Sequence, residues 1–322
     1  MLRNTAAADT SSKRLDVAAF FKRYGCFIVL AVVLLINILL TPNFVDIGTF
    51  RNIVIQSTPI ILISMGMTMV IATGGIDISV GSVMAISSMV AAQNLEMGLV
   101  PAVIMAVLFG GLCGLWNGFI IAKFKIQPII VTLMMMITGR GIAQVLNDAR
   151  ILFVTDAQFN ALGTRSLIGD VPIQTIYIIA AFGLVLFLIK LTAFGRYVQA
   201  MGDNPSAARL AGVNTFWTIL MVYMITSMLA GFAGVIETAR MSAAEGNTIG
   251  RLMELDAIAA VAVGGTALSG GKARVAGTLV GALIMQLITI SVIMNNIPFE
   301  FSQIIKAIII IIAVYLQREK SA

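Results

Sequence analysis

Residues 53–82 read IVIQSTPIILISMGMTMVIATGGIDISVGS, a long apolar run followed by a glycine-rich segment with one carboxylate, Asp77. The apolar part is as long as the roughly 20 residues that a helix needs to cross a bilayer. Gly74, Gly75 and Gly81 weaken a helix across the segment 73–82. Non-helical backbone at membrane depth is tolerated only against protein or a water-filled cavity. Asp77 therefore either caps the next helix from a tight turn at the inner surface, or lines a transport path.

The whole chain has the composition of an integral membrane protein. Of its 322 residues, 59% are hydrophobic and 11% are charged, whereas a soluble domain has about 25% charged residues. The net charge of +6 is explained by basic cytoplasmic loops, so we expect no nucleic-acid partner. The sequence has no histidine, and Cys26 and Cys113 lack the spacing of a metal or disulfide framework. We expect no enzyme and no metal or cofactor bound by this chain.

Ten apolar runs of about bilayer length are separated by Pro, Gly or charged residues. They are 24–41, 53–73, 78–94, 99–122, 127–146, 172–192, 215–236, 254–269, 275–294 and 300–316. The runs 78–94 and 254–269 are short for membrane spans. Residues 1–23 are polar and basic, and we interpret them as a cytoplasmic tail before a retained first span. The prediction is an all-α, polytopic membrane protein that forms one domain over residues 1–322.

Lys and Arg are distributed unevenly between the two sides of these runs. If the N-terminus is cytoplasmic and each run crosses once, most basic residues are cytoplasmic, as the positive-inside rule expects. The cytoplasmic set is Arg3, Lys13, Arg14, Lys22, Arg23, Lys123, Lys125, Lys190, Arg196, Arg209, Lys272, Arg274, Arg318 and Lys320. The opposite set is Arg51, Arg150, Arg165, Arg240 and Arg251. Both termini are thus expected in the cytoplasm. Arg140 and Lys306 lie inside runs and are expected to snorkel to the interface.

The cytoplasmic loop 193–214 is expected to contain a short helix. Residues 203–212 read DNPSAARLAG, in which Asp203 or Asn204 suits an N-cap, Pro205 the first helical position and Gly212 the stop. One interpretation is a helix on the membrane surface that ties two spans together. The other is a protruding helix that docks into a cytoplasmic partner. The spacing alone does not favour either.

A second glycine-rich segment lies at 255–272, where LDAIAA is followed by GGTALSGGK at 264–272. A phosphate-binding loop would need Gly at position 266 and Ser or Thr after Lys272, but the chain has Thr266 and Ala273. We therefore expect no ATPase site and attribute the small residues to helix packing. If the chain is two five-span halves with the second inverted, Asp77 and Asp256 occupy corresponding places. Paired short, Gly-interrupted segments point to a transporter binding site.

Several motifs together resemble one family. They are ATGGIDISVGS at 72–82, QPIIVTL at 127–133 with Arg140-Gly141, the loop from Gly195-Arg196-Tyr197 to Asn204, and LDAIAA at 255–260 with Gly264-Gly265-Thr266 and Gly277-Thr278. They are similar to motifs of bacterial monosaccharide ABC-importer permeases of the ribose and galactofuranose type, in order over nearly the whole chain. The resemblance implies an inner-membrane permease that dimerises with itself or a related permease. It would receive sugar from a periplasmic binding protein and be driven by a separate cytoplasmic ATPase that uses ATP and Mg²⁺.

The resemblance also favours the docking interpretation of the loop helix. The implied ATPase-coupling residues are Asp203, Asn204, Pro205, Ala207, Ala208, Arg209 and Gly212. The wider pattern Glu-Ala-Ala-x-x-x-Gly appears here without its Glu, because Ser206 occupies that position.

An uncharged, hydroxyl-rich substrate suits a pathway of Ser, Thr, Asn and backbone groups. The candidate pathway residues are Asp77, Ser79, Asn117, Thr132, Asp256 and Thr266. The alternative function is an ion-coupled secondary transporter of a small polar solute. No run has an acid at its centre, which disfavours proton coupling and leaves sodium coupling open.

Overall fold

The structure, a computed structural model, describes residues 17–317, with side chains between residues 25 and 311. Residues 1–16 of the expected tail 1–23 lie outside the described residues, as do Arg318 and Lys320. The described chain is helical except for loops and one antiparallel pair of two-residue strands, β1 (Leu152–Phe153) and β2 (Ala243–Ala244). The predicted all-α class is confirmed.

Each of the ten expected runs contains a helix. These helices are α1 (Val17–Leu40), α2 (Ile47–Ala72), α3 (Val80–Gln93), α4 (Leu99–Phe124), α5 (Pro128–Val145), α7 (Gln174–Leu191), α10 (Thr215–Met241), α11 (Met253–Val263), α12 (Val275–Met294) and α13 (Glu300–Gln317). Shorter helices in the connections are η1 (Leu95–Met97), α6 (Ala157–Thr164), α8 (Ala193–Asp203) and α9 (Pro205–Leu210). Among the described residues, 6 helices are long and apolar enough to cross a membrane, namely α2, α4, α5, α7, α10 and α12.

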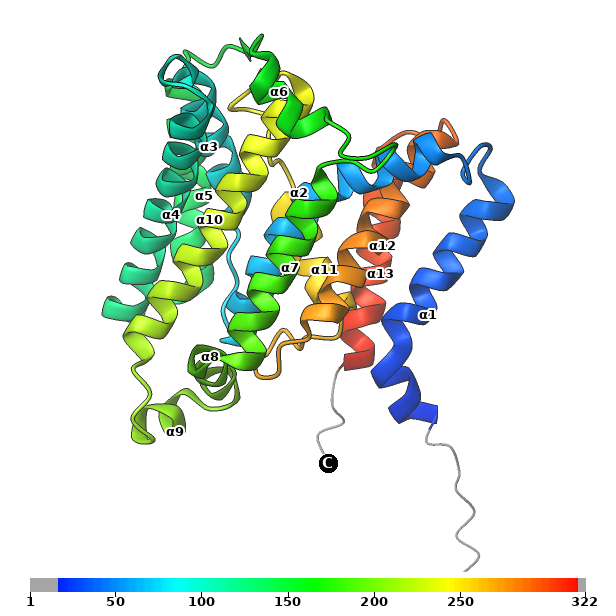
Figure 1. Cartoon of the computed structure of the whole chain (residues 1–322). Helices are drawn as coiled ribbons and strands as arrows, with labels where there is room; N and C mark the ends of the chain where they lie inside the picture. Colours follow the sequence, from blue (N-terminus) through cyan, green and yellow to red (C-terminus); the bar gives the residue numbers. More distant parts are fainter. Residues whose placement is uncertain (1–16, 318–322) are drawn as a thin grey trace, which may run out of the picture.

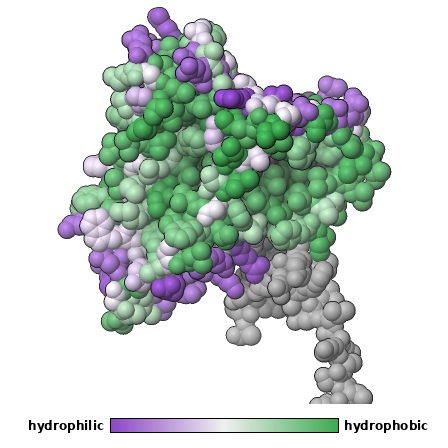
Figure 2. Space-filling model, in the orientation of Figure 1, coloured by the Kyte–Doolittle hydropathy of each residue, from purple (hydrophilic) through white to green (hydrophobic). Residues whose placement is uncertain are grey.

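The long helices run between two polar ends of the molecule (Figure 1). One end carries α8, α9 and the loop before α12, and the other carries α6. The first described helix begins, and the last ends, at the end that carries α8 and α9. Figure 2 shows a broad hydrophobic band between hydrophilic patches at the two ends. This distribution is that of a multi-pass membrane protein, whose apolar surface faces lipid.

The helices α3 and α11 are too short to cross the bilayer alone. They have 14 and 11 residues, or about 21 and 16 Å at 1.5 Å per residue, against a hydrocarbon core of about 30 Å. Non-helical chain at 73–79 precedes α3, and non-helical chain at 242–252 precedes α11. We call these segments the first break and the second break. The number of ten complete crossings therefore stays a prediction.

The two breaks approach the middle of the protein from opposite ends. The first break starts at the α8 end, where the Gly271 N–H donates a hydrogen bond to the Ala72 carbonyl oxygen at 3.0 Å. The second break starts beside α6, which packs on α10. The breaks meet where Gly81, in the first turn of α3, lies against the Gly250 backbone with no room for a side chain. Two half-length helices entered from opposite ends are what two inverted halves would produce.

Candidate functional site

The first break is held in an extended form by Asp77. Its Oδ1 accepts hydrogen bonds from the Ser79 backbone N–H at 2.9 Å and from the Ser79 hydroxyl at 2.6 Å. Gly74 has a φ of +80°, and a Cβ added at Gly75 would lie 2.6 Å from the Tyr223 Oη. Helical backbone therefore cannot continue from α2. Asp77 is fully buried, and both interpretations of its segment, a turn at the inner surface and a lining of the transport path, stay predictions.

Side chains of α4 and α5 hold the same break. Asn117 on α4 donates from Nδ2 to the Ser79 Oγ at 3.0 Å. Thr132 on α5 donates to the carbonyl oxygen of Ile76 at 3.3 Å and to that of Pro128 at 3.0 Å. The structure thus brings four of the candidate residues together, namely Asp77, Ser79, Asn117 and Thr132, and all four are fully buried. They form an internal cluster within one subunit, which we call the Asp77 cluster.

The other two candidates lie in the second half. Asp256 on α11 forms an ion pair with Lys306 on α13, with 2.7 Å between Oδ2 and Nζ. Thr266 accepts a hydrogen bond at Oγ1 from the Arg274 backbone N–H at 3.0 Å. In the described part of the chain, no hydrogen bond joins either residue to the Asp77 cluster. Lys306 is only 6% exposed, so the expectation that it snorkels was wrong.

Arg140 on α5 holds the second break. Its Nη1 donates to the carbonyl oxygens of Gly246 at 2.9 Å and Ile249 at 2.7 Å. These carbonyls have no helical partners, and a guanidinium can satisfy two of them at once. The expectation that Arg140 snorkels to the interface was therefore wrong. Because Thr132 binds the first break, α5 is attached to both breaks.

The loop 193–214 contains the expected short helix and a longer one before it. The Asn204 Oδ1 accepts from the N–H groups of Ser206 and Ala207, both at 3.0 Å. Asn204 is therefore the N-cap of α9, whereas Asp203 is the last residue of α8. Gly212 follows α9 with a φ of +84°, as a helix stop requires. The preceding α8 was not predicted, although the N-cap Thr192 and the inward-facing Val198 and Met201 are its sequence signals.

The implied coupling residues on α9 differ in their exposure. Ala208 is buried, whereas Ala207 and Arg209 are exposed. Leu210 is 90% exposed, which is unusual for an apolar side chain at a polar end of a membrane protein. The helix projects from the end of the molecule (Figure 1). An exposed apolar residue on a projecting helix is typical of a contact with another protein.

The end of α8 is wedged between the two glycine-rich segments. A Cβ added at Gly202 would overlap both the Ala72 carbonyl oxygen and the Gly271 backbone nitrogen, the two atoms of the hydrogen bond described above. A Cβ added at Gly270 would lie 3.0 Å from the Cα and the carbonyl oxygen of Gly202 and 3.0 Å from the Gly74 backbone nitrogen. We call this contact of three backbones the glycine junction. It joins the loop 193–214 to the first break and to the loop after α11.

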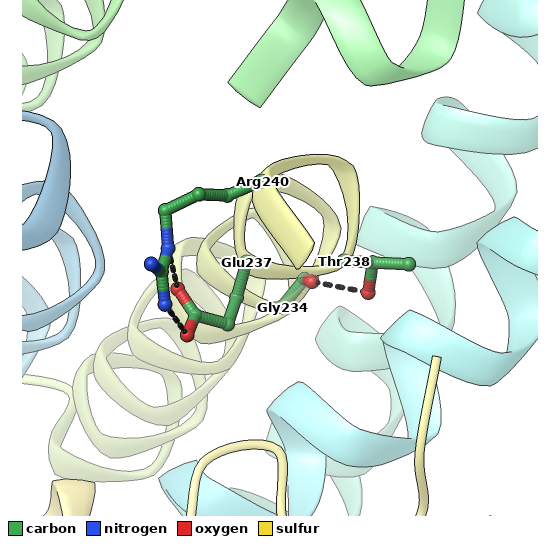
Figure 3. A network of polar contacts seen from close by, with 4 residues as sticks. All are labelled: Gly234, Glu237, Thr238 and Arg240. Carbon is green, nitrogen blue, oxygen red and sulfur yellow. Dashed lines mark hydrogen bonds and ion pairs between the residues drawn. The ribbon is translucent and has the colours of Figure 1, made fainter. Parts of the chain in front are cut away.

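A cavity of about 290 Å³ lies at the opposite end, between α2, α6 and α10. Its lining includes Arg51, Gln56 and Arg240. The Arg51 Nη2 donates to the Thr164 carbonyl oxygen at 3.0 Å. Figure 3 shows Glu237 and Arg240 on one side of α10 and Thr238 on another. Glu237 and Arg240 form an i,i+3 ion pair, with Arg240 Nε and Nη2 at 3.1 and 2.5 Å from the Glu237 carboxylate oxygens.

Comparison with known proteins identifies the family. Residues 49–314 match the family described as the permease component of the branched-chain amino acid transport system. A galactofuranose transporter permease protein of Escherichia coli K12 is 37% identical over 305 residues, 91% of this chain and 89% of that protein. The ribose import permease protein of the same strain is 37% identical over 96% of this chain and 98% of its own. A D-allose transport system permease protein of Escherichia coli K12 is 33% identical over 96% of this chain and 95% of that protein. No solved structure matches the chain significantly.

This chain belongs to this family of transport-system permease components. The resemblance inferred from the motifs is therefore confirmed, and the chain is a membrane-embedded transport protein. Sequence reasoning missed three parts of this permease. They are the helix α8, the attachment of Arg140 to the second break and the position of Tyr223 against Gly75. For Tyr223 the sequence holds no local signal, because the two residues are far apart along the chain.

Proposed function

We propose that this permease is the membrane-spanning subunit of an ATP-driven importer that carries a monosaccharide into the cytoplasm. The sugar would be a pentose, a hexose or galactofuranose. The observation that carries the proposal is 37% identity, over nearly the full length of the chain, to permeases named for ribose import and galactofuranose transport. The separate match to an allose permease supports a sugar over other polar solutes.

The proposed complex contains a second permease copy or a related permease, a cytoplasmic ATPase and a periplasmic sugar-binding protein. ATP and Mg²⁺ would be bound by the ATPase alone. The complex would lie in the bacterial inner membrane with both permease termini in the cytoplasm. The basic residues Lys190, Arg196, Arg209 and Lys272 support this orientation, because they belong to the end that carries α8 and α9 and cytoplasmic ends are enriched in Lys and Arg.

The ATPase would dock on the loop 193–214. The projecting α9, its exposed Leu210 and the small residues beside it support this role. A six-residue helix is too short to be stable alone, so a docked partner and the packing of Ala208 would hold it. Asp203, Asn204, Pro205 and Gly212 would shape the helix, while Ala207, Arg209 and Leu210 would contact the ATPase.

Movement of this loop would reach the sugar pathway through the glycine junction. Backbones in direct contact cannot move independently, because interiors are close-packed. A shift of α8 would therefore displace the start of the first break and the loop after α11 together. Asp77, Ser79, Asn117 and Thr132 are buried inside the subunit, so they would act on the pathway by positioning the first break. Asp256 and Thr266 would position α11 and the loop after it.

Uptake by cells tests the proposed function. The permease is expressed, with the ATPase and binding protein encoded beside it, in a strain that lacks its own pentose and hexose importers. Labelled ribose, galactose and allose are then offered. We expect uptake of one sugar to persist when ion gradients are collapsed with ATP maintained, and to stop when ATP is depleted. Uptake that follows the ion gradient instead would identify an ion-coupled carrier and contradict the proposal.

A further inference from the structure

Four buried oxygen atoms on the first break, α4 and α10 have no hydrogen-bond partner among the described residues. They are Asp77 Oδ2, Asn117 Oδ1, Tyr223 Oη and Ser227 Oγ. Asp77, Asn117 and Ser227 are fully buried, and Tyr223 is 1% exposed. Buried polar groups are nearly always satisfied, so a group of four that are not indicates a bound ligand.

The four residues lie on three segments that contact one another. Asn117 is hydrogen-bonded to Ser79, and Ser79 to Asp77. Tyr223 and Ser227 are one turn apart on α10, and their side chains face the first break and α4. A Cβ added at Gly75 would lie 2.6 Å from the Tyr223 Oη, and one added at Gly114 would lie 2.7 Å from the Ser227 Oγ. Gly114 is one turn from Asn117 on α4. The first break, α4 and α10, which pack against one another, thus each carry buried oxygen atoms without a partner among the described residues.

The charge of this region needs compensation. Asp77 takes part in none of the ion pairs between described residues, and an unpaired carboxylate in a protein interior is costly. The N-terminus of α3 supplies about half a positive charge. The N-terminus of α11 adds little, since its first turn carries Glu254 and Asp256. Water could complete the hydrogen bonds but would leave the remaining charge in place.

The chemistry of the region selects the ligand. Only oxygen atoms are offered, and hard cations prefer them. One carboxylate matches a single positive charge, and among the described residues no three acidic, Cys or His side chains gather to hold a metal of higher charge. Neither Gly75 nor Gly114 has room for an added methyl group, and such close packing favours a single ion over a sugar.

We propose that Asp77, Asn117, Tyr223 and Ser227 bind a small monovalent cation of the Na⁺ class. The ion fixes the first break against α4 and α10. It is a resident of the fold, so the proposal is independent of sugar import and of its energy source.

The test measures the purified permease alone. Its thermal unfolding midpoint is followed while Na⁺ replaces choline at constant ionic strength, and binding of radioactive Na⁺ is measured in parallel. We expect the midpoint to rise with Na⁺ and to saturate. Asp77→Asn, which has the same size without the charge, removes both the rise and the binding. Ser227→Ala raises the half-saturating Na⁺ concentration by roughly tenfold, the effect typical of weakening a metal site.

Ser57→Ala is the matched control, because the Ser57 hydroxyl is also buried without a partner but lies in the outer part of α2. It should keep the wild-type Na⁺ response. A thermal unfolding midpoint of the wild-type permease that does not change with Na⁺ concentration overturns the proposal. A midpoint that depends on pH but not on Na⁺ also overturns it, by showing that Asp77 carries a proton. If Asp77→Asn does not fold, a Ser227→Ala response equal to wild type overturns it.

Discussion

Replacing Gly202 by alanine tests whether the loop 193–214 and the two glycine-rich segments move as one unit. The added methyl group overlaps both partners of the hydrogen bond between Gly271 and Ala72. Both partners are backbone atoms, so no side-chain rotation relieves the overlap. Losing the hydrogen bond costs about 0.5–1.5 kcal/mol, and overpacking typically costs about 1–3 kcal/mol. The closed form of the glycine junction, in which this hydrogen bond is made, is thus disfavoured by about 1.5–4.5 kcal/mol.

If transport requires the closed junction, this free energy lowers the uptake rate more than tenfold, since about 1.4 kcal/mol corresponds to one factor of ten. The assay compares sugar uptake, membrane level and ATPase co-purification. Membrane level and co-purification should persist, because the exposed surface of α9 is unchanged. Gly183→Ala on α7 is the control, as nothing lies within 4 Å of a Cβ added there. Wild-type uptake by Gly202→Ala at a normal membrane level would refute the reasoning.

The remaining predictions concern topology, docking and the buried ion pair. Single cysteines at Arg165 and Lys272, in a chain without Cys26 and Cys113, should react with impermeant reagents from opposite sides; reaction of both from outside would contradict the orientation. Leu210→Glu should abolish ATPase co-purification while the permease still inserts, because Leu210 is 90% exposed and a charge there opposes an apolar contact; retained co-purification would argue against docking on α9. Lys306→Met should lower the free energy of unfolding by about 3–5 kcal/mol, since Asp256 is left without its partner. A double variant that also carries Asp256→Leu should recover most of that loss in chemical unfolding, and no recovery would show that the pair is not what Lys306 stabilises.

Local signals were sufficient for much of this fold. The apolar runs predicted the positions of the long helices, because lipid forces every crossing to be both apolar and helical. The N-cap Asn204 and the stop Gly212 predicted α9, since both act through hydrogen bonds or dihedral angles of the nearest residues. Three other candidate pathway residues, Ser79, Asn117 and Thr132, lie beside Asp77 in the structure, and their part in the pathway stays a prediction.

Long-range packing decided the rest. From its place near the end of an apolar run, Arg140 was predicted to extend to the membrane–water interface. Instead, its guanidinium donates hydrogen bonds to the carbonyl oxygens of Gly246 and Ile249, about 100 residues later in the chain. The run 78–94 is apolar enough for a span, yet the chain enters α3 through a non-helical segment, in which Gly74 has a φ of +80° and Gly75 packs against the Tyr223 hydroxyl. Ala208 follows the equally small Ser206 and Ala207, and only packing beyond its own helix determines that Ala208 is buried while those two are exposed.

The contact between Gly81 and Gly250 can form only late in biosynthesis. Gly250 is synthesised roughly 170 residues after Gly81, an interval of about 10–30 s at ordinary elongation rates. Until then the first break, with its carboxylate, is covered by α4, α5 and α10 but lacks the contact that the second break makes with the start of α3. The nascent chain must therefore keep this segment in the insertion machinery or near the lipid headgroups until those three helices arrive. A chain that stops before α11 should be recognised by membrane proteases, however well its earlier helices have inserted.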